Sequence, residues 1–427
     1  MVYVLNQNGQ PIMPTNNHAK VRVLLKNGKA KVIKRCPFTI QLLYSCENKT
    51  QPISLGIDAG SKHIGISATT KGKNTRALVL YEADVTLRND IVELLSTRKE
   101  MRRARRNRKT RYRKARFNNR RKHDGWLAPS VREKIDTHLT VIANVHKILP
   151  ITKITVETAS FNIQKIKNPN IKGIEYQQGE QLGFWNVREY VMWRDNHICQ
   201  CCKGKSKDKV LNVHHIESRK IGGNAPNNLV TLCEYCHNQY HKGNIQLPKS
   251  IKRGASFKDS TFMGIMRWNL YDKLKETYPN VNMAYGYATK NTRIKHNLPK
   301  EHYIDARCIS DYPEAIHPFD KTVVYYQKKV RCHNRQIHKM SILKGGYRKR
   351  NQADYLVKGF RLFDKVLYKN QECFIFGRRK DGRFAIRLLD GTKINEQVLY
   401  KKLKILESAK HYIIERRTPL LVGKAAG

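Results

Sequence analysis

Apolar runs that end in an acidic residue occur at distant points of the chain. Residues 53–58 (ISLGID) end in Asp58, after which AGSK predicts a turn and HIGISA predicts a second, paired strand. A later run, ITKITVE, ends in Glu157, and EHYIDARCIS at 301–310 has the pattern of a helix that carries Asp305. The pattern therefore predicts two strands and one helix that each present a carboxylate.

The first 47 residues form a small basic unit. Residues 2–5 and 38–44 have strand character. The VRVLLKNG segment between them is either a helix that ends at Gly28 or one arm of a hairpin.

Other elements are expected farther along the chain. Residues 134–149 and a segment around 260–276 have the pattern of helices, whereas 281–288 (VNMAYGYA) resembles a strand. Residues 359–406 alternate apolar and polar positions between NQ, KDG and DGT turns. This alternation predicts a small β-barrel-like domain.

The densest positive charge lies in residues 98–122, which hold fifteen Lys or Arg and a single acid, Glu100. Few helix breakers occur there, so the segment predicts a long helix. Arginine outnumbers lysine by eleven to four, which favours phosphate binding by planar guanidinium groups. The alternative is a solvated face or one that binds DNA without specificity.

The charge excess extends over the whole chain, with 83 Lys and Arg against 34 Asp and Glu and a net charge of +49 in 427 residues. Self-repulsion of this size destabilises a compact protein unless a polyanion is bound, and nucleic acid is the expected polyanion. A ribosomal or membrane-surface protein would not need the metal-site spacings described below. The sequence has no apolar run of membrane-spanning length and no signal-peptide pattern, so we expect a cytoplasmic protein without a membrane partner.

Five of the ten cysteines lie within residues 199–236, which indicates metal binding in a reducing compartment rather than a disulfide framework. Two Cys-x2-Cys pairs in this segment suit one tetrahedral Zn²⁺, and four thiolate ligands would make that zinc structural. Cys201 leaves the first pair open, although the two-residue spacer favours Cys199. The expected ligands are Cys199, Cys202, Cys233 and Cys236.

Histidines and an asparagine accompany these cysteine pairs. His214 and His215 end a short apolar run, Asn228 precedes the second pair, and His237-x3-His241 follows it in an expected helix. This order resembles the HNH (ββα-metal) nuclease superfamily. The resemblance implies that His214 binds a catalytic metal and that His215 is the general base. It also implies that Asn228 orients the base or joins the metal shell, and that His237 and His241 complete the site.

The three acids lie on either side of this module along the chain. Nucleases that use two divalent metals about 4 Å apart need several converging carboxylates. The segments around Asp58, Glu157 and Asp305 resemble, in order, the three RuvC motifs of RNase H-like nucleases. The resemblance implies that these acids bind Mg²⁺ or Mn²⁺. His302, three residues before Asp305 on the same expected helix face, would assist as a base.

The order of all these segments is similar to that of the IscB family, the transposon-associated RNA-guided RuvC/HNH endonucleases related to type II CRISPR effectors. PIMP at 11–14 matches the motif that names the family's N-terminal domain, with Ile12 where Leu is usual. ARFNNRRKHDGWLAP and KGIEY are further stretches expected in that family. The resemblance covers nearly the whole chain.

The resemblance implies an α/β multidomain fold in which an RNase H-like (RuvC) domain is split by an inserted ββα-metal HNH domain. The expected domains are a PLMP-type N-terminal domain at 1–47, three RuvC parts at 48–95, 126–180 and 256–315, an Arg-rich bridge helix at 96–125, the HNH nuclease at 181–255 and a basic C-terminal domain at 316–427.

The resemblance also implies RNA-guided cleavage of double-stranded DNA in a prokaryotic, monomeric ribonucleoprotein. The HNH site would cut the guide-paired strand and the RuvC site the displaced strand, with Mg²⁺ or Mn²⁺ at both sites and a structural Zn²⁺. The partners would be a guide (omega) RNA and a target DNA whose short flanking motif the C-terminal domain reads. The expected RNA-binding residues are Arg102, Arg103, Arg105, Arg106, Arg108, Arg111, Arg113 and Arg116.

Two alternatives stay open from sequence alone. A protein-only HNH endonuclease of the homing or restriction type would take its specificity from protein–base contacts. A transposon accessory protein with vestigial sites would bind nucleic acid without cutting it, although all the expected catalytic residues are present.

Overall fold

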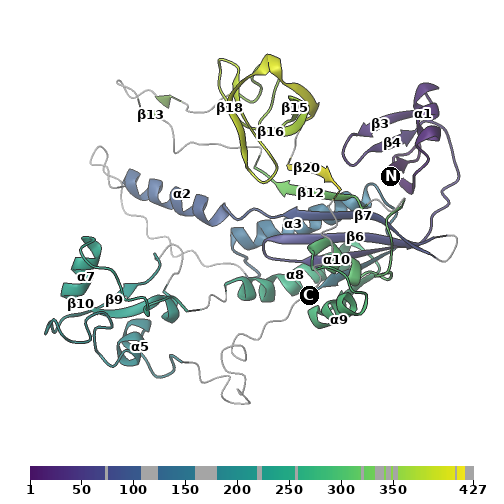
Figure 1. Cartoon of the computed structure of the whole chain (residues 1–427). Coiled ribbons are helices and arrows are strands. Elements are labelled where there is room, and N and C mark those ends of the chain that lie inside the picture. The colour runs from purple at the N-terminus through teal and green to yellow at the C-terminus, as the bar shows by residue number, and fades with distance from the viewer. Residues whose placement is uncertain are drawn as a thin grey trace. The chain divides into compact units, whose positions relative to one another are not determined.

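The computed structural model describes residues 1–72, 76–106, 124–158, 180–218, 224–254, 258–318, 322–331, 341–342, 348–349, 354–408 and 411–418. The chain divides into two compact units (Figure 1). The larger unit comprises Met1–Ser160 and Met263–Gly427, and the smaller unit comprises Phe161–Phe262.

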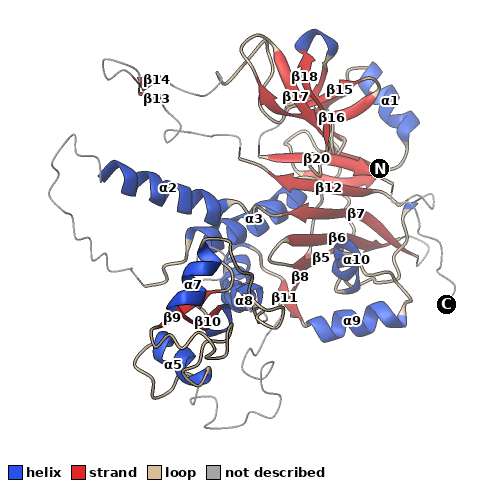
Figure 2. Ribbon diagram, turned by 60° about the vertical axis from the view of Figure 1, so that its left-hand side comes forward, coloured by secondary structure: helices blue, strands red, loops and turns tan. Residues whose placement is uncertain are grey.

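A seven-stranded sheet, in the order β11-β8-β5-β6-β7-β12-β20, forms the centre of the larger unit (Figure 2). Its first five strands are β5 (Ile53–Ala59), β6 (His63–Lys71), β7 (Ala77–Thr86), β8 (Lys153–Glu157) and β11 (Val281–Ala284). β5, β6 and β7 are antiparallel neighbours, whereas β8 runs parallel to β5 and β11 runs parallel to β8. The predicted pairing of ISLGID with HIGISA is therefore confirmed as the β5–β6 pair.

Two strands from the C-terminal part of the chain complete this sheet. β12 (Val324–Lys329) lies parallel to β7, and β20 (Tyr412–Arg417) lies antiparallel to β12. The expected C-terminal domain at 316–427 therefore contributes two strands to the sheet of the larger unit. The sequence did not reveal this because β12 and β20 are separated by some eighty residues and their pairing is non-local.

The helices of the larger unit include one that lies directly on the sheet, α10, which contacts β5 and β6 (Figure 2). The helices are α2 (Ile91–Arg106), α3 (Pro129–His146), α8 (Lys258–Thr277), which begins in the smaller unit, α9 (Gly286–Lys295) and α10 (His302–Cys308). The predicted helices at 134–149, 260–276 and 301–310 are thus confirmed as α3, α8 and α10. Of the basic segment 98–122, residues 107–122 lie outside the described residues.

The predicted strand at 281–288 is wrong in its second half. β11 ends at Ala284, and α9 begins at Gly286 with Tyr285 as its N-cap. The apolar and aromatic pattern of VNMAYGYA crosses a strand–helix junction, and a short run of this kind does not distinguish the two periods.

Two glycines allow α10 to approach the sheet closely. A Cβ atom added at Gly56 would lie 1.9 Å from the carbonyl oxygen of Ala306, and one added at Gly65 would lie 1.8 Å from that of His302. Any larger residue would force the helix away from β5 and β6. These glycines therefore set how closely the helix that carries the third acid approaches the strand that carries the first.

A buried charge cluster fastens α10 to β7. Glu82 is fully buried, and its carboxylate oxygens lie 2.9 Å from Nε of Arg307 on α10 and 2.8 Å from Nε2 of His317. The hydroxyl of Ser67 donates a hydrogen bond to the same carboxylate. Because a buried charge is costly unless it is paired, this cluster holds the helix in one position relative to the sheet.

The N-terminal unit is a four-stranded sheet in the order β2-β1-β4-β3 with one helix. Its elements are β1 (Val2–Leu5), β2 (Pro11–Thr15), α1 (His18–Lys26), β3 (Ala30–Lys34) and β4 (Thr39–Leu42). The VRVLLKNG segment is therefore helical up to Lys26. The side chain of Asn17 caps the helix by accepting a hydrogen bond from the backbone amide of Lys20.

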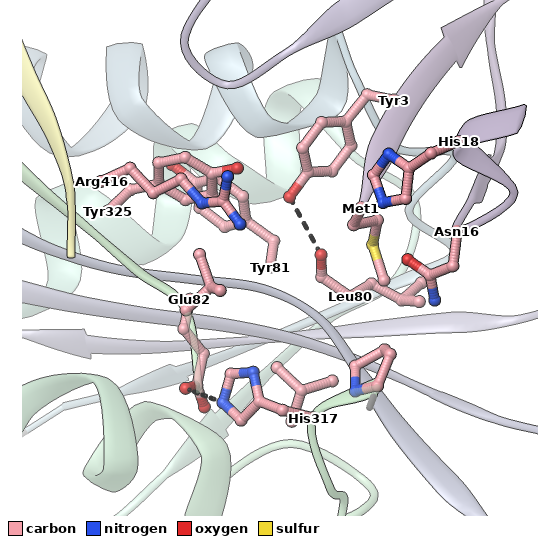
Figure 3. Close-up of a pocket in the computed structure, with 13 residues that line it drawn as sticks. Met1, Tyr3, Asn16, His18, Leu80, Tyr81, Glu82, His317, Tyr325 and Arg416 are labelled. Atoms are coloured by element: carbon pink, nitrogen blue, oxygen red, sulfur yellow. Dashed lines mark hydrogen bonds and ion pairs between the residues drawn. The ribbon is translucent and has the colours of Figure 1, made fainter. Parts of the chain in front are cut away.

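The N-terminal sheet meets the large sheet around a cavity of about 250 Å³ (Figure 3). Tyr3 of β1 donates a hydrogen bond from its hydroxyl to the carbonyl oxygen of Leu80 on β7, at 3.0 Å. Its ring also packs edge-on against Tyr81. The side chains of Glu82 and His317 face each other at one end of this cavity (Figure 3).

Residues between β12 and β20 form a separate sheet, which is antiparallel throughout, in the order β18-β17-β16-β15-β19. Its strands are β15 (Lys365–Tyr368), β16 (Gln371–Arg378), β17 (Arg383–Arg387), β18 (Lys393–Leu399) and β19 (Lys404–Glu407), with a 3-10 turn, η5 (Tyr400–Lys402), before the last. Val366, Cys373, Ile375, Phe384 and Ile386 form its core. A short pair, β13 (Ser341–Ile342) with β14 (Arg348–Lys349), precedes this sheet.

The smaller unit contains a helix, a two-stranded hairpin and a second helix. Its elements are α5 (Val187–Arg194), β9 (Leu211–His215), the 3-10 turn η2 (Pro226–Asn228), β10 (Leu229–Cys233) and α7 (Glu234–His241). β9 and β10 are antiparallel, and α7 follows β10 directly. Among the described residues of both units, no helix combines the length and the apolar character needed to cross a membrane.

We predict that Glu82→Ala destabilises the chain by about 3–5 kcal/mol, because it leaves the buried guanidinium of Arg307 without its partner. Chemical denaturation of the full-length protein measures the loss. Glu396→Ala, which removes an exposed partner of Lys393, is the matched control and should change the midpoint little. Equal midpoint shifts for the two variants would contradict the anchoring role of Glu82.

Candidate functional site

Four cysteine thiols converge in the smaller unit. The Sγ atoms of Cys199, Cys202, Cys233 and Cys236 all lie within 4.8 Å of one another, whereas Cys201 is outside the group. A tetrahedral zinc with Zn–S bonds of about 2.3 Å requires sulfur atoms about 3.8 Å apart. The sulfur atoms of Cys202 and Cys233 are 3.9 Å apart. The four thiols therefore fit a single tetrahedral metal ion.

The surroundings of this cysteine cluster favour the thiolate form at Cys202, whereas burial raises the pKa of Cys199 and of Cys236. The hydroxyl of Ser206 lies 3.4 Å from Sγ of Cys202 and 3.1 Å from Sγ of Cys233. Burial raises the pKa of the Cys202 thiol, but hydrogen bonds from Ser206 outweigh it and lower this pKa to about 6. Cys233 also caps α7, where its sulfur accepts a hydrogen bond from the backbone amide of Cys236. Sequence analysis missed Ser206, because a serine in a lysine-rich loop gives no signal of its own.

Three histidines form a second cluster in the same unit. His214 comes from β9, and His237 and His241 lie one turn apart on α7, so the hairpin and the helix bring them together. One ring nitrogen from each lies within 4.8 Å of the others, and the Nε2 atoms of His237 and His241 are 3.2 Å apart. This arrangement offers three nitrogen ligands to one metal ion.

His214 and His237 of this cluster are held in the neutral form that binds metals. Burial, and then the neighbouring His237 and His241, lower the pKa of His214 to about 4. Burial and His241 also lower the pKa of His237. Because the neutral imidazole is the metal ligand, these rings are ready to bind a cation at neutral pH.

His215 lies outside the histidine cluster. Successive side chains of a strand point to opposite faces, so His215 and its neighbour His214 face different ways. Nε2 of His215 lies 3.0 Å from the side-chain oxygen of Asn224. The structure therefore separates the residue expected to be the base from the three that could bind metal, and it adds Asn224 as a contact that the sequence did not indicate.

Asn228 is buried, and its side chain forms hydrogen bonds with the backbone. Its side-chain oxygen accepts a hydrogen bond from the amide of Glu217 at 2.9 Å, and its side-chain nitrogen donates one to the carbonyl oxygen of Glu217 at 3.0 Å. Both ends of the side-chain amide are thus occupied. Asn228 was expected to orient the base or to join a metal shell; in the structure its side-chain amide binds the backbone of Glu217, two residues after His215.

The three acids meet at one edge of the large sheet. Asp58 at the end of β5 and Glu157 at the end of β8 are direct partners on neighbouring parallel strands. Asp305 lies on α10 and forms an ion pair with Arg293 of α9, with 2.9 Å between Nε and Oδ1. Unlike the cysteine and histidine clusters, the three carboxylates are not all within 4.8 Å of one another.

Burial and the neighbouring carboxylates raise the pKa of two of these acids, Glu157 and Asp305. Burial raises the pKa of Glu157 to about 7; a hydrogen bond from Thr289 opposes this rise, and the nearby Asp58 and Asp305 add to it. Burial and Asp58 also raise the pKa of Asp305. Carboxylates that repel one another in a half-buried site are stabilised by a cation, so this donor set fits oxygen-seeking divalent metals.

His302 contacts the first acid directly. Its Nδ1 atom lies 2.8 Å from Oδ2 of Asp58, and this hydrogen bond raises the pKa of His302. The ring stacks on that of His63, with centroids 5.1 Å apart and planes 6° from parallel. His63 in turn lies 3.0 Å from Asp84. Sequence analysis missed His63 and Asp84, which are ordinary polar positions within strands.

Only part of the predicted arginine surface is described. Arg102 and Arg103 lie exposed on α2, and Arg105 and Arg106 end that helix. The other expected RNA-binding residues lie outside the described residues: Arg108, Arg111, Arg113 and Arg116. Of the family-like stretches, PIMP forms most of β2, whereas KGIEY and residues 115–123 of ARFNNRRKHDGWLAP also lie outside the described residues.

Solved structures of Cas9 are similar to parts of the chain. Cas9 of Streptococcus thermophilus in complex with the GGAA PAM is 12% identical, with a TM-score of 0.32 over 49% of this chain and 29% of that one. The type II-C Cas9 of Actinomyces naeslundii is 11% identical, with a TM-score of 0.26 over 61% of this chain and 60% of that one. The chain spans less than two thirds of the length of these proteins.

Two protein families match the chain, and none of the curated proteins matches it significantly. The RRXRR protein family matches residues 2–179, and the HNH endonuclease family matches residues 199–243. The second match covers the cysteine cluster and the histidine cluster, and the first covers Asp58 and Glu157. The chain is therefore similar to RRXRR proteins over residues 2–179 and to HNH endonucleases over the segment that carries the cysteine and histidine clusters.

Proposed function

We propose that this protein is an RNA-guided endonuclease that cuts both strands of double-stranded DNA at two separate sites. The observation that carries the proposal is the presence of two different metal-type donor sets in one chain. The smaller unit holds His214, His237 and His241, and the larger unit holds Asp58, Glu157 and Asp305. Two sites of different chemistry suit a substrate with two strands.

The hairpin and helix of the smaller unit would cut the guide-paired strand. The three histidines would hold a divalent cation against the scissile phosphate, and three imidazole ligands suit a transition metal better than Mg²⁺. His215, on the other face of β9, would take the proton of the attacking water as general base. Asn224 and Asn228 would fix the position of this base, the first by contacting its ring and the second by clamping the backbone at Glu217.

The acid edge of the large sheet would cut the displaced strand as a RuvC site. The order β7-β6-β5-β8-β11, with three antiparallel strands followed by two parallel ones, supports an RNase H-like fold. Residues 161–262 enter between β8 and β11, which supports a RuvC domain split by an HNH insert. Asp58, Glu157 and Asp305 would bind the metal ions.

A divalent cation bound at either site would polarise the scissile phosphate and activate the attacking water. The side chains around the acids would hold a carboxylate, carry a proton and contact phosphate. Thr289 holds the carboxylate of Glu157, and His302, hydrogen-bonded to Asp58, can carry a proton at the edge of the site. Arg293, now paired with Asp305, would be free to contact phosphate once a cation neutralises that acid.

The charge of the chain supports RNA as the partner that selects the target. A net charge of +49 requires a polyanion, and the arginine-rich α2 exposes Arg102 and Arg103. A guide RNA bound there would leave recognition of the target to base pairing, and the C-terminal sheet would read a short flanking motif. The RNA would also screen the self-repulsion of the protein.

The first prediction concerns the guide-paired strand. His215→Ala should slow its cleavage at least about 100-fold, since a general base contributes this much or more, and should leave cleavage of the displaced strand intact. A target labelled on each strand separately measures both rates. His197→Asn changes an exposed histidine of the same unit and serves as the control. Loss of both cuts in His215→Ala would show that the sites are not independent.

Asp58→Ala should have the opposite effect. The displaced strand should no longer be cut, because the acid edge loses the carboxylate to which both His302 and the metal bind, and the guide-paired strand should be nicked at the normal rate. Asp90→Ala, at an exposed acid of the same unit, should cut both strands. Continued cleavage of the displaced strand in Asp58→Ala would disprove the RuvC assignment.

RNA guidance is tested by changing the RNA alone. If the RNA that copurifies with the protein is replaced by one with a new guide segment, cleavage should move to DNA that matches the new segment. Sequencing of the cleaved ends measures the shift. Cleavage that stays at its original site would instead support a protein-only HNH endonuclease, which needs no RNA.

The cysteine cluster is expected to hold one structural Zn²⁺ per chain. Cys202→Ala should remove the bound zinc and lower the melting temperature, because the four thiolates share one ion. Elemental analysis of the purified protein measures the stoichiometry. Cys201→Ala is the matched control: this adjacent cysteine lies outside the cluster, and its loss should leave the zinc in place. Loss of zinc from both variants, or from neither, would contradict the assignment.

A further inference from the structure

Two exposed tyrosines stand beside the acid edge of the large sheet. Tyr285 is the N-cap of α9, and Tyr287 lies in the first turn of that helix. Tyr285 is 43% exposed and Tyr287 is 70% exposed. Their rings are parallel to within 10°, with centroids 6.0 Å apart. The two rings therefore form a stacked aromatic pair that is exposed to solvent.

The backbone that carries these rings touches the second acid. A Cβ atom added at Gly286, between the two tyrosines, would lie 3.0 Å from Oε1 of Glu157. Thr289, one turn into the same helix, donates a hydrogen bond from its hydroxyl to Oε2 of Glu157. The start of α9 is thus fixed to the carboxylate, and the two rings are fixed with it.

The chemistry of the pair suits nucleobases better than other ligands. Large aromatic rings are mostly buried in folded proteins, and a pair of parallel exposed rings is a platform on which a flat ligand can stack. The acids next to it would bind the metals that cut a phosphodiester. A basic chain attracts the polyanionic strand to which such bases belong.

We propose that Tyr285 and Tyr287 form a stacking platform that holds bases of single-stranded DNA beside the scissile phosphate at the acid site. The proposal rests on the RuvC role of Asp58, Glu157 and Asp305. Bases in a duplex are covered by their neighbours, whereas the bases of a displaced strand expose their faces. The platform would therefore accept the displaced strand and reject the duplex. It would also tolerate any sequence, since every base has a π-face.

The test replaces both rings in the complete ribonucleoprotein. Tyr285→Ala with Tyr287→Ala should slow cleavage of the displaced strand roughly ten-fold or more, since base–aromatic stacking has this value. Cleavage of the guide-paired strand should not change, which also shows that the variant is folded. The corresponding double change to Phe should restore the rate, because the stacking face remains.

A control variant separates stacking from general exposure of apolar groups. Ile294 is 63% exposed on the same helix, two turns farther along. Ile294→Ala should therefore cut both strands at the normal rate. An equal loss in this variant would overturn the assignment of the platform to the two tyrosines.

DNA with abasic positions next to the scissile phosphate probes the same contact from the other side. Such DNA should lower the rate of the unchanged protein to that of the double Ala variant and should not slow that variant further. If the rate losses caused by the abasic DNA and by the double Ala variant add up when the two are combined, direct stacking is contradicted. If Asp58→Ala abolishes the cut while the double Ala variant cuts normally, the platform is wrong and the acid site stands. If Asp58→Ala still cuts the displaced strand, both proposals fail.

Discussion

The larger unit depends on the close packing of α10 against β5 and β6. Gly56 and Gly65 allow this approach because any side chain there would collide with the backbone of the helix. The buried pair of Glu82 and Arg307 then holds the helix in place. Asp305 is carried on this helix, so these contacts, together with the hydrogen bond between His302 and Asp58, set the distance between the third acid and the other two. The buried ion pair is costly to form, and it specifies position more than it adds stability.

The two candidate sites differ in the charge of the groups that would bind a cation. In the smaller unit, burial and neighbouring rings keep His214 neutral, so a metal ion does not have to displace a proton from this ring. In the larger unit, burial and repulsion between carboxylates raise the pKa of Glu157, so a bound cation would reduce this repulsion. The thiol cluster beside the histidines has a third character, because its four soft ligands leave no position for a substrate. These differences support separate roles in one reaction on two strands.

Local patterns in the sequence predicted the elements that carry the chemistry. The strands of Asp58 and Glu157 and the helix of Asp305 were each recognisable from a short run, and the cysteine and histidine spacings were recognisable from a single turn or knuckle. The strand predicted across residues 281–288 was wrong, because the period of a short apolar run does not distinguish the end of β11 from the start of α9. That junction places Tyr285 and Tyr287 beside Glu157, so the error hid a candidate site.

The types of donor atom, their order along the chain and the excess of positive charge could all be predicted, because these depend only on residue identity and spacing. The fold is needed to see that His215 contacts Asn224 and lies outside the histidine cluster, that Asn228 binds the backbone of Glu217 and that His63 stacks on His302. It also decided that β12 and β20 extend the central sheet. Each of these facts is a contact between residues distant in the sequence or a choice of strand face, and pairing across long loops leaves no local signal in the residues that take part.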